Sequence, residues 1–191
     1  MSLCGVIGYK NKTVNTLRLW NAEANNDFSD YASLSADEIR ARQDYRNWVN
    51  HITEFLYPND STPDGKRLRL VQEFFFVSAG LQSIVRHYKL THDDLYELGE
   101  KIGIHINDTH PAVAVAELMR ILVDENGMEW SDAREITTQV MAYTNHTILP
   151  EALEKWPVDM VKRNIPRIYM IIEEINRRFL MDVRRRYPGD E

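Results

Sequence analysis

Two short polar motifs in this sequence carry side chains that can bind or transform a ligand. The first, Ile106–Pro111 (INDTHP), places an asparagine, an aspartate, a threonine and a histidine between an apolar run and a proline. The second, Tyr143–Thr147 (YTNHT), has the same character and precedes another proline-containing segment. Carboxylates, imidazoles and amides ligate metals, cap helices or hydrogen-bond hydroxyl-rich ligands. Three chemistries are therefore open for these motifs.

A metal site is one interpretation of the first motif, because His105, Asp108 and His110 would suit a metal-dependent hydrolase. On a strand His105 faces away from Asp108, and no further histidine or carboxylate spacing completes a coordination set, so we expect no metal. A helix cap is a second interpretation, with Thr109 or His110 just before Pro111 at a helix start. A cap needs only one such residue.

A ligand-facing role is the third interpretation, and it follows from position. The run Ile102–Ile106 alternates as a strand should, and a helical pattern comes directly after the motif. In open α/β sheets, ligands bind beyond the carboxyl ends of strands, where the chain crosses into a helix. Asp108 and His110 lie at that crossing, while Asn145 and His146 precede a second helix N-terminus with free N–H groups.

The elements that must position these motifs are mostly helical. A capping box of Ser35 and Glu38 predicts one helix start, and a stretch apolar on more than one face predicts a deeply buried helix. Three strands alone make a poor sheet, which favours a piece of a larger α/β protein. The expected strands are Val6–Tyr9, Val14–Trp20 and Ile102–Ile106; the expected helices are Ser35–Leu56, Leu68–Val85, Val115–Val123, and three that begin at Ser131, Pro150 and Pro166.

Composition bounds the class of protein. The 191 residues carry a formal net charge of −6 without a basic cluster among aromatics, so we expect no nucleic-acid partner. Cys4 is the only cysteine, which excludes an internal disulfide framework and favours the cytoplasm. No segment approaches the ~20 apolar residues of a membrane helix. Residues 1–4 are interpreted as an expression remnant or disordered start, and residues 5–191 as a single α/β segment.

Five stretches resemble the glycogen/maltodextrin phosphorylase family, in family order from about Gly5 to the C-terminus. They are NTLRLWNA (Asn15–Ala22), LYPND (Leu56–Asp60), GKRLRLVQEFFFVSAGLQ (Gly65–Gln82), INDTHPAVAVAELMRILVD (Ile106–Asp124) and AYTNHTILPEALEKWPVDM (Ala142–Met160). The resemblance implies a predominantly helical fragment, with a few strands, of the Rossmann-like N-terminal domain of a glycosyltransferase-B-type α/β fold.

The resemblance also implies a chemistry. Family members are longer chains that transfer glucosyl units from α-1,4-glucans to orthophosphate and release glucose 1-phosphate. Their pyridoxal 5′-phosphate is bound to a lysine in the C-terminal half, for which this sequence has no match. The resemblance therefore implies an enzyme as the parent protein and an inactive fragment here. A stand-alone, non-catalytic carbohydrate-binding or regulatory module that reuses this segment is the alternative from another class.

The family's site residues are carried over by motif. His146 matches the histidine that contacts the glucosyl residue, with its main-chain carbonyl near the developing positive charge. The carboxylates would repel one another unless Arg69 and His110 offset them. The residues implied to lie on the substrate side are Asp108, His110, Asn145, Thr147, Asp60, Arg69 and Glu154.

Two departures from the family pattern bear on regulation, and one helix bears on assembly. Ser61–Pro63 stands where animal enzymes carry an asparagine and two phenylalanines, so the aromatic inhibitor site is in doubt. Arg86 and His87 stand where nucleotide-regulated members have two arginines for a phosphate effector, which weakens that regulation. The Ser35–Leu56 helix matches the family's homodimer helix, so its apolar stripe is implied to be interface, with intramolecular core as the alternative.

Overall fold

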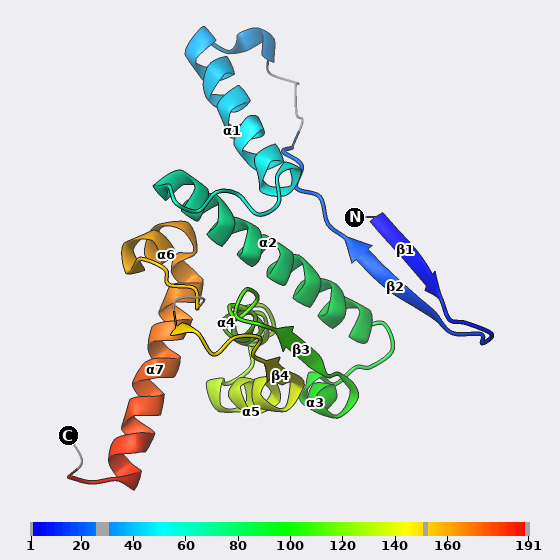
Figure 1. Cartoon of the computed structure of the whole chain (residues 1–191), viewed down its shortest axis with the longest axis vertical. Coiled ribbons are helices and arrows are strands. Elements are labelled where there is room, and N and C mark those ends of the chain that lie inside the picture. Colours follow the sequence, from blue (N-terminus) through cyan, green and yellow to red (C-terminus); the bar gives the residue numbers. More distant parts are fainter. Residues whose placement is uncertain (1, 26–30, 151–152, 190–191) are drawn as a thin grey trace. The chain divides into compact units, whose positions relative to one another are not determined.

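The computed structural model describes residues 2–25, 31–150 and 153–189. The chain divides into two compact units, residues 1–76 and 77–191. The boundary between the two units falls inside α2 (Pro63–Tyr88) (Figure 1). The first half of this helix belongs to unit 1 and the second half to unit 2. Each unit is described by itself.

Unit 1 begins with an antiparallel hairpin. Its strands pair from Ser2 opposite Leu19 to Ile7 opposite Val14, which confirms the two predicted strands. The first strand runs from Ser2 to Ile7, so it starts and ends earlier than the predicted Val6–Tyr9. The elements of this unit are β1 (Ser2–Ile7), β2 (Val14–Leu19), η1 (Tyr31–Ser33), α1 (Ala36–Glu54) and the first half of α2.

The start of α1 follows its sequence signal. The Ser35 hydroxyl accepts from the Glu38 backbone N–H, and the Glu38 carboxylate accepts from the Ser35 backbone N–H at 2.8 Å, which confirms the capping box. The helix ends at Glu54, two residues before the predicted end at Leu56. Tyr45 on this helix is 63% exposed within the chain.

Unit 2 contains the core around which both polar motifs are placed. Helix α4 packs against α5 and α7, and α3 packs against α5. The side chains that fill this core include Leu98, Leu118, Leu122, Ala133, Ile168 and Ile171, each no more than 1% exposed. The elements after α2 are η2 (Leu95–Glu97), α3 (Leu98–Lys101), β3 (Ile104–Asn107), α4 (Ala114–Arg120), the π-helical η3 (Ile121–Glu125), α5 (Trp130–Val140), β4 (Met141–Thr144), α6 (Val158–Asn164) and α7 (Pro166–Arg186).

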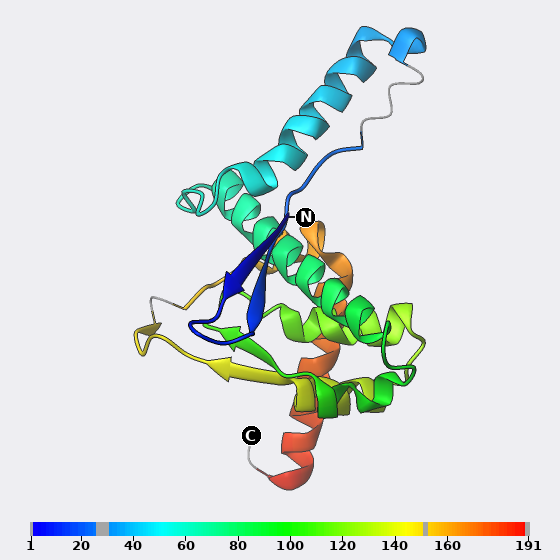
Figure 2. The ribbon, with the colours of Figure 1, turned by 90° about the vertical axis from the view of Figure 1, so that its right-hand side faces the viewer.

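A parallel pair of strands is the part of unit 2 that matters most for the site. Strand β3 confirms the predicted strand, and it pairs with β4 in a register that runs from Ile104 opposite Met141 to Asn107 opposite Thr144. Figures 1 and 2 show the two arrowheads at the same edge. The sequence did not predict β4, which follows α5 directly after Val140.

One predicted helix cap and one predicted helix start are wrong. Helix α4 begins at Ala114 after Val113, and no side chain of the described residues caps it, so neither Thr109 nor His110 has the expected role. Turn residues separate the motif from the helix. Ser131 lies inside α5, whose N-cap position is Glu129. In both places the chain turns through backbone contacts instead of a side-chain cap.

The last two predicted helices have different outcomes. The helix predicted from Pro150 falls in part on residues 151–152, which lie outside the described residues, and residues 153–157 are not helical. Helix α7 begins at Pro166, as predicted. Of its predicted core face, Ile168 and Ile171 are buried but Phe179 is 63% exposed.

Helix α2 is less buried than its sequence predicted. Leu70, Leu81 and Val85 are buried, but most of its apolar residues are half-buried in this chain. By length and composition alone, α2 is apolar enough to cross a membrane. Core helices of soluble proteins pass the same test, so this property is weak evidence.

Candidate functional site

The carboxyl ends of β3 and β4 form one edge, and the first polar motif begins there. The Asp108 backbone N–H donates to the Thr144 carbonyl at 2.8 Å, one step beyond the last paired residues. Asp108 has a φ of 67°, a left-handed conformation that turns the chain out of the strand. Its carboxylate Oδ1 accepts from the Thr109 N–H at 2.7 Å, a local bond that suits aspartate to such a turn.

Three predicted site residues come together around an imidazole. The His110 Nδ1 lies 3.2 Å from the Glu154 carboxylate, and its Nε2 lies 3.9 Å from the Asp108 carboxylate. The side chains of Glu154 and Asp108 are 14% and 21% exposed, against 45% for His110. His110 therefore lies between the two carboxylates.

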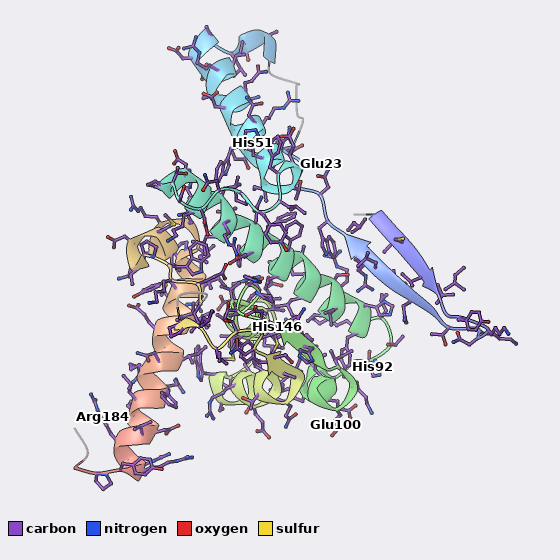
Figure 3. The ribbon with its side chains drawn as sticks, in the orientation of Figure 1. Glu23, His51, His92, Glu100, His146 and Arg184 are labelled. Atoms are coloured by element: carbon purple, nitrogen blue, oxygen red, sulfur yellow. The ribbon has the colours of Figure 1, made fainter. Side chains whose placement is uncertain are left out.

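The second polar motif contributes His146 at the same edge. Its Nε2 lies 2.5 Å from Oδ1 of Asn107, the last residue of β3. The ring is exposed, and Figure 3 shows it near the strand pair of unit 2. An exposed imidazole fixed on one side by an amide presents its other nitrogen to a ligand.

Asn145 and Thr147 shape the loop that carries His146. The Asn145 amide donates to the Thr147 carbonyl and accepts from the Tyr143 hydroxyl at 3.3 Å. The Thr147 hydroxyl in turn accepts from the Leu149 N–H at 3.1 Å. In the described chain the polar groups of Asn145 and Thr147 therefore form hydrogen bonds within the loop itself.

His105 contacts the neighbouring strand. Its Nε2 hydrogen-bonds the Thr144 hydroxyl across the parallel pair. This contact uses the imidazole to tie β3 to β4.

Two further predicted residues lie in unit 1 and pair with each other. The Arg69 guanidinium lies 3.8 Å from the Asp60 carboxylate and donates through Nε to the Glu73 carboxylate at 3.2 Å. Arg69 is 19% exposed, whereas Asp60 is 53% exposed. Arg69 therefore offsets Asp60 as expected, and Glu73 is an additional partner that the sequence did not indicate.

At the end of β3, Asn107 thus contacts His146, and the next residue, Asp108, contacts His110, which also contacts Glu154. A family model described as carbohydrate phosphorylase matches residues 3–191 of this chain. The chain belongs to the carbohydrate phosphorylase family.

Similar proteins agree with this membership. A glycogen phosphorylase of Bacillus subtilis (strain 168) is 53% identical over 185 residues, which cover 97% of this chain and 22% of that protein. A glycogen phosphorylase of Chlamydia trachomatis is 48% identical over 185 residues, and the muscle form of Ovis aries is 48% identical over 195; each match covers 97% of this chain and 23% of the relative. This phosphorylase segment therefore spans less than a quarter of the length of these relatives, and its few strands and many helices fit part of an α/β domain.

One residue of the phosphorylase segment was missed at the sequence level. Asn107 lies inside the first polar motif, but its position in the sequence indicates no role. Its role becomes visible only because the pairing of β3 with β4 places His146 beside it. The signal that would have found it is the likeness of the two motifs. Each ends an extended stretch in an asparagine followed by a charged or ionisable residue.

Proposed function

We propose that this chain is part of an α-1,4-glucan phosphorylase, which transfers terminal glucosyl units from glycogen or maltodextrin to orthophosphate and releases glucose 1-phosphate. The family match over residues 3–191 supports the chemistry. The observation that carries the site is that Asn107, which contacts His146, and the next residue, Asp108, which contacts His110, lie together at the end of β3. His110 also contacts Glu154. Fixed imidazoles, carboxylates and amides at a strand edge suit a ligand rich in hydroxyl groups.

His146 is the residue that we assign to the reacting glucosyl unit. Its exposed ring binds a sugar hydroxyl, and its main-chain carbonyl faces the positive charge that develops in an oxocarbenium-like transition state. Fixed oxygen dipoles stabilise such a charge without reorganising during the reaction. Asn145 and Thr147 hold this loop through their mutual hydrogen bond.

The remaining assigned residues are charged or ionisable side chains on the substrate side of the site. Asp108 and Glu154 accept hydrogen bonds from sugar hydroxyls, and His110 between them keeps the two carboxylates compatible. By the family resemblance, Asp60 and Arg69 of unit 1 belong to the substrate side as well, and Arg69 offsets the charge of Asp60.

Pyridoxal 5′-phosphate is the cofactor that the family implies, and this chain does not fit it. A lysine that forms a Schiff base is activated by desolvation in a pocket. Every lysine of this chain is exposed except Lys66, which is half-buried. We therefore assign the cofactor to the part of the parent protein beyond these residues, and no step of the chemistry above passes through it.

We further place the parent enzyme in the cytoplasm as a homodimer. The family's dimer helix corresponds to α1, where Tyr45 is 63% exposed, and Phe55 just after the helix is 58% exposed. Trp48 is less available, because the Arg67 guanidinium lies 4.2 Å from the centroid of its ring. Exposed aromatic side chains of this kind are enriched in protein interfaces.

The decisive experiment uses the full-length protein. We expect phosphate-dependent release of glucose 1-phosphate from maltoheptaose and from glycogen, and the ratio of the two rates shows the preferred glucan. Glucan binding without any phosphorolysis would instead support the non-catalytic module. If the protein neither binds glucan nor releases glucose 1-phosphate, both hypotheses are refuted.

Replacement of His146 by alanine tests the assignment of this residue. In the full-length enzyme we expect His146→Ala to lower kcat/KM by about 10- to 100-fold, since it removes a sugar contact and loosens the carbonyl beside it. The thermal midpoint should change little, because the side chain is exposed. His87→Ala is the matched control, since His87 is also exposed and lies on α2. Normal kinetics in His146→Ala would refute the assignment.

A further inference from the structure

Asn107 and His146 meet only because β3 and β4 are parallel neighbours. Asn107 lies opposite Thr144 at the end of the pair, and His146 follows Thr144 by two positions. The side chains touch through Oδ1 of Asn107 and Nε2 of His146 at 2.5 Å, although the residues are 39 positions apart. The contact is therefore a product of tertiary structure.

The amide of Asn107 is held in place by the strand pair. The residue after it, Asp108, donates its backbone N–H to the Thr144 carbonyl, and His105 bonds the Thr144 hydroxyl from the same strand. These bonds fix the end of β3 on both sides of Asn107. A group set on a strand end is positioned more exactly than one on a free loop.

The chemistry of the contact selects one form of the imidazole. An amide oxygen can only accept, so the ring nitrogen that faces it must carry a hydrogen. In the neutral ring the other nitrogen then has a free lone pair and can only accept. Among the described residues, no hydrogen-bond partner occupies Nδ1 of His146.

We infer that Asn107 is a positioning residue that holds the proton of His146 on Nε2, so that Nδ1 accepts a hydrogen bond from one hydroxyl of the glucosyl unit. This inference rests on the proposed function for the identity of the ligand, but the tautomer itself does not depend on it. The neutral amide also matters. A carboxylate at this position would favour the doubly protonated ring, in which Nδ1 donates and no longer accepts.

Kinetics with altered substrates separate this role from simple structural support. The full-length enzyme is assayed in the direction of glucan synthesis, with glucose 1-phosphate or each of its monodeoxy analogues as donor and maltoheptaose as acceptor. We expect Asn107→Leu to lower kcat/KM for glucose 1-phosphate on the order of tenfold, the effect of one hydrogen bond. For the one analogue that lacks the contacted hydroxyl, wild type and variant should differ less than about twofold, since no bond remains to be lost.

The control substitution is Asn176→Leu. Asn176 is exposed on α7, away from the assigned residues in sequence, and the same change there should leave every donor unaffected. A loss in Asn107→Leu that is equal for all donors would show a general structural defect and overturn the inference. So would kinetics identical to wild type.

The protonation of His146 is measured without any turnover. The full-length protein is labelled with [15N]histidine, and the ring signals of His146 are assigned from their absence in His146→Gln. Long-range 1H–15N correlations should show a neutral ring protonated on Nε2 in the wild type and a mixture of tautomers in Asn107→Leu.

The two measurements fail in different ways. If the full-length protein has no phosphorolytic activity but His146 carries its proton on Nε2 only when Asn107 is present, the proposed function is wrong and the positioning role stands. If the enzyme is active and the tautomer is the same with and without Asn107, the positioning role is wrong and the proposed function stands.

Discussion

A fully buried carboxylate in unit 2 gives the sharpest test of what holds this fold together. Glu117 on α4 is 0% exposed. Its carboxylate accepts from Arg120 Nε at 2.6 Å and from a second guanidinium nitrogen at 2.7 Å. The Ser78 hydroxyl on α2 donates to the same carboxylate at 2.6 Å. The hydrogen bond to Glu117 raises the pKa of Arg120 above its ordinary value, so the guanidinium stays charged.

We predict that Arg120→Met destabilises the chain by about 3–4 kcal/mol at pH 7. Methionine keeps the length of the side chain but removes both charge-assisted bonds to Glu117, each worth roughly 1.5–3 kcal/mol. It also removes the pair of Arg120 with the more exposed Glu125 at 2.8 Å, which adds less. In this variant the buried Glu117 carboxylate can become neutral by binding a proton. Protonation costs about 3.7 kcal/mol for an ordinary glutamate at pH 7. The cost of protonation sets an upper limit on the loss in free energy of unfolding. It agrees with the ~3–5 kcal/mol measured when one partner of a buried ion pair is removed.

The assay is urea unfolding of the 191-residue chain followed by circular dichroism. With a slope of about 2 kcal/mol/M, the midpoint should fall by roughly 1.5–2 M. The loss should shrink as the pH is lowered, because the folded variant then takes up its proton more easily than at neutral pH. The double variant Glu117→Leu with Arg120→Met should be more stable than Arg120→Met alone, since no unpaired charge remains.

Arg185→Met is the matched control for this prediction. Arg185 pairs with Asp182 at 2.9 Å, but its side chain is 76% exposed, so its replacement should cost less than about 0.5 kcal/mol. Equal losses in the two single variants would contradict the reasoning. A loss in Arg120→Met that does not change between pH 8 and pH 5 would do the same.

Two further predictions concern unit 2. The hydrogen bond from Arg167 lowers the pKa of Asp124, so their pair adds stability above the unfolded carboxyl value of about 3.9 and loses it as the pH falls through the lower folded value. Asp124→Asn should therefore cost up to ~1 kcal/mol at pH 7, and this cost should shrink in urea titrations as the pH falls below about 3.9, whereas a constant difference would contradict the linkage. Thr137 is 4% exposed and its hydroxyl has no partner among the described residues, so Thr137→Val should be neutral or stabilising by up to ~1 kcal/mol in thermal melts. Thr138, whose hydroxyl bonds the Arg134 carbonyl at 2.8 Å, is the comparison, and a clear loss in Thr137→Val would reveal a missed partner.

Local signals in the sequence predicted several elements correctly. The Ser35–Glu38 capping box marks the start of α1 because its bonds close within one turn. Pro166 opens α7 because its fixed φ and missing N–H suit the first helical position. The alternation up to Ile106 identifies β3 because neighbouring side chains on a strand face opposite sides.

Predictions that depended on distant contacts failed or stayed incomplete. The sequence does not predict a strand at Met141–Thr144, which becomes β4 because β3 offers it a parallel partner. The exposed Phe179 continues an apolar helical stripe, yet the described residues of this chain leave it uncovered. Periodicity reports which face of an element is apolar, but it does not say what covers that face.

The sequence by itself determined the family, the residue types of the site and the helix and strand starts that short-range bonds decide. Only the tertiary structure decided which of these residues meet. His110 meets Glu154, which is distant in sequence, and His146 meets Asn107 because β3 and β4 run parallel and end together. The physical reason is that side-chain chemistry and capping are local properties. The pairing of β3 with β4 closes a long loop, and its free energy comes from the whole unit.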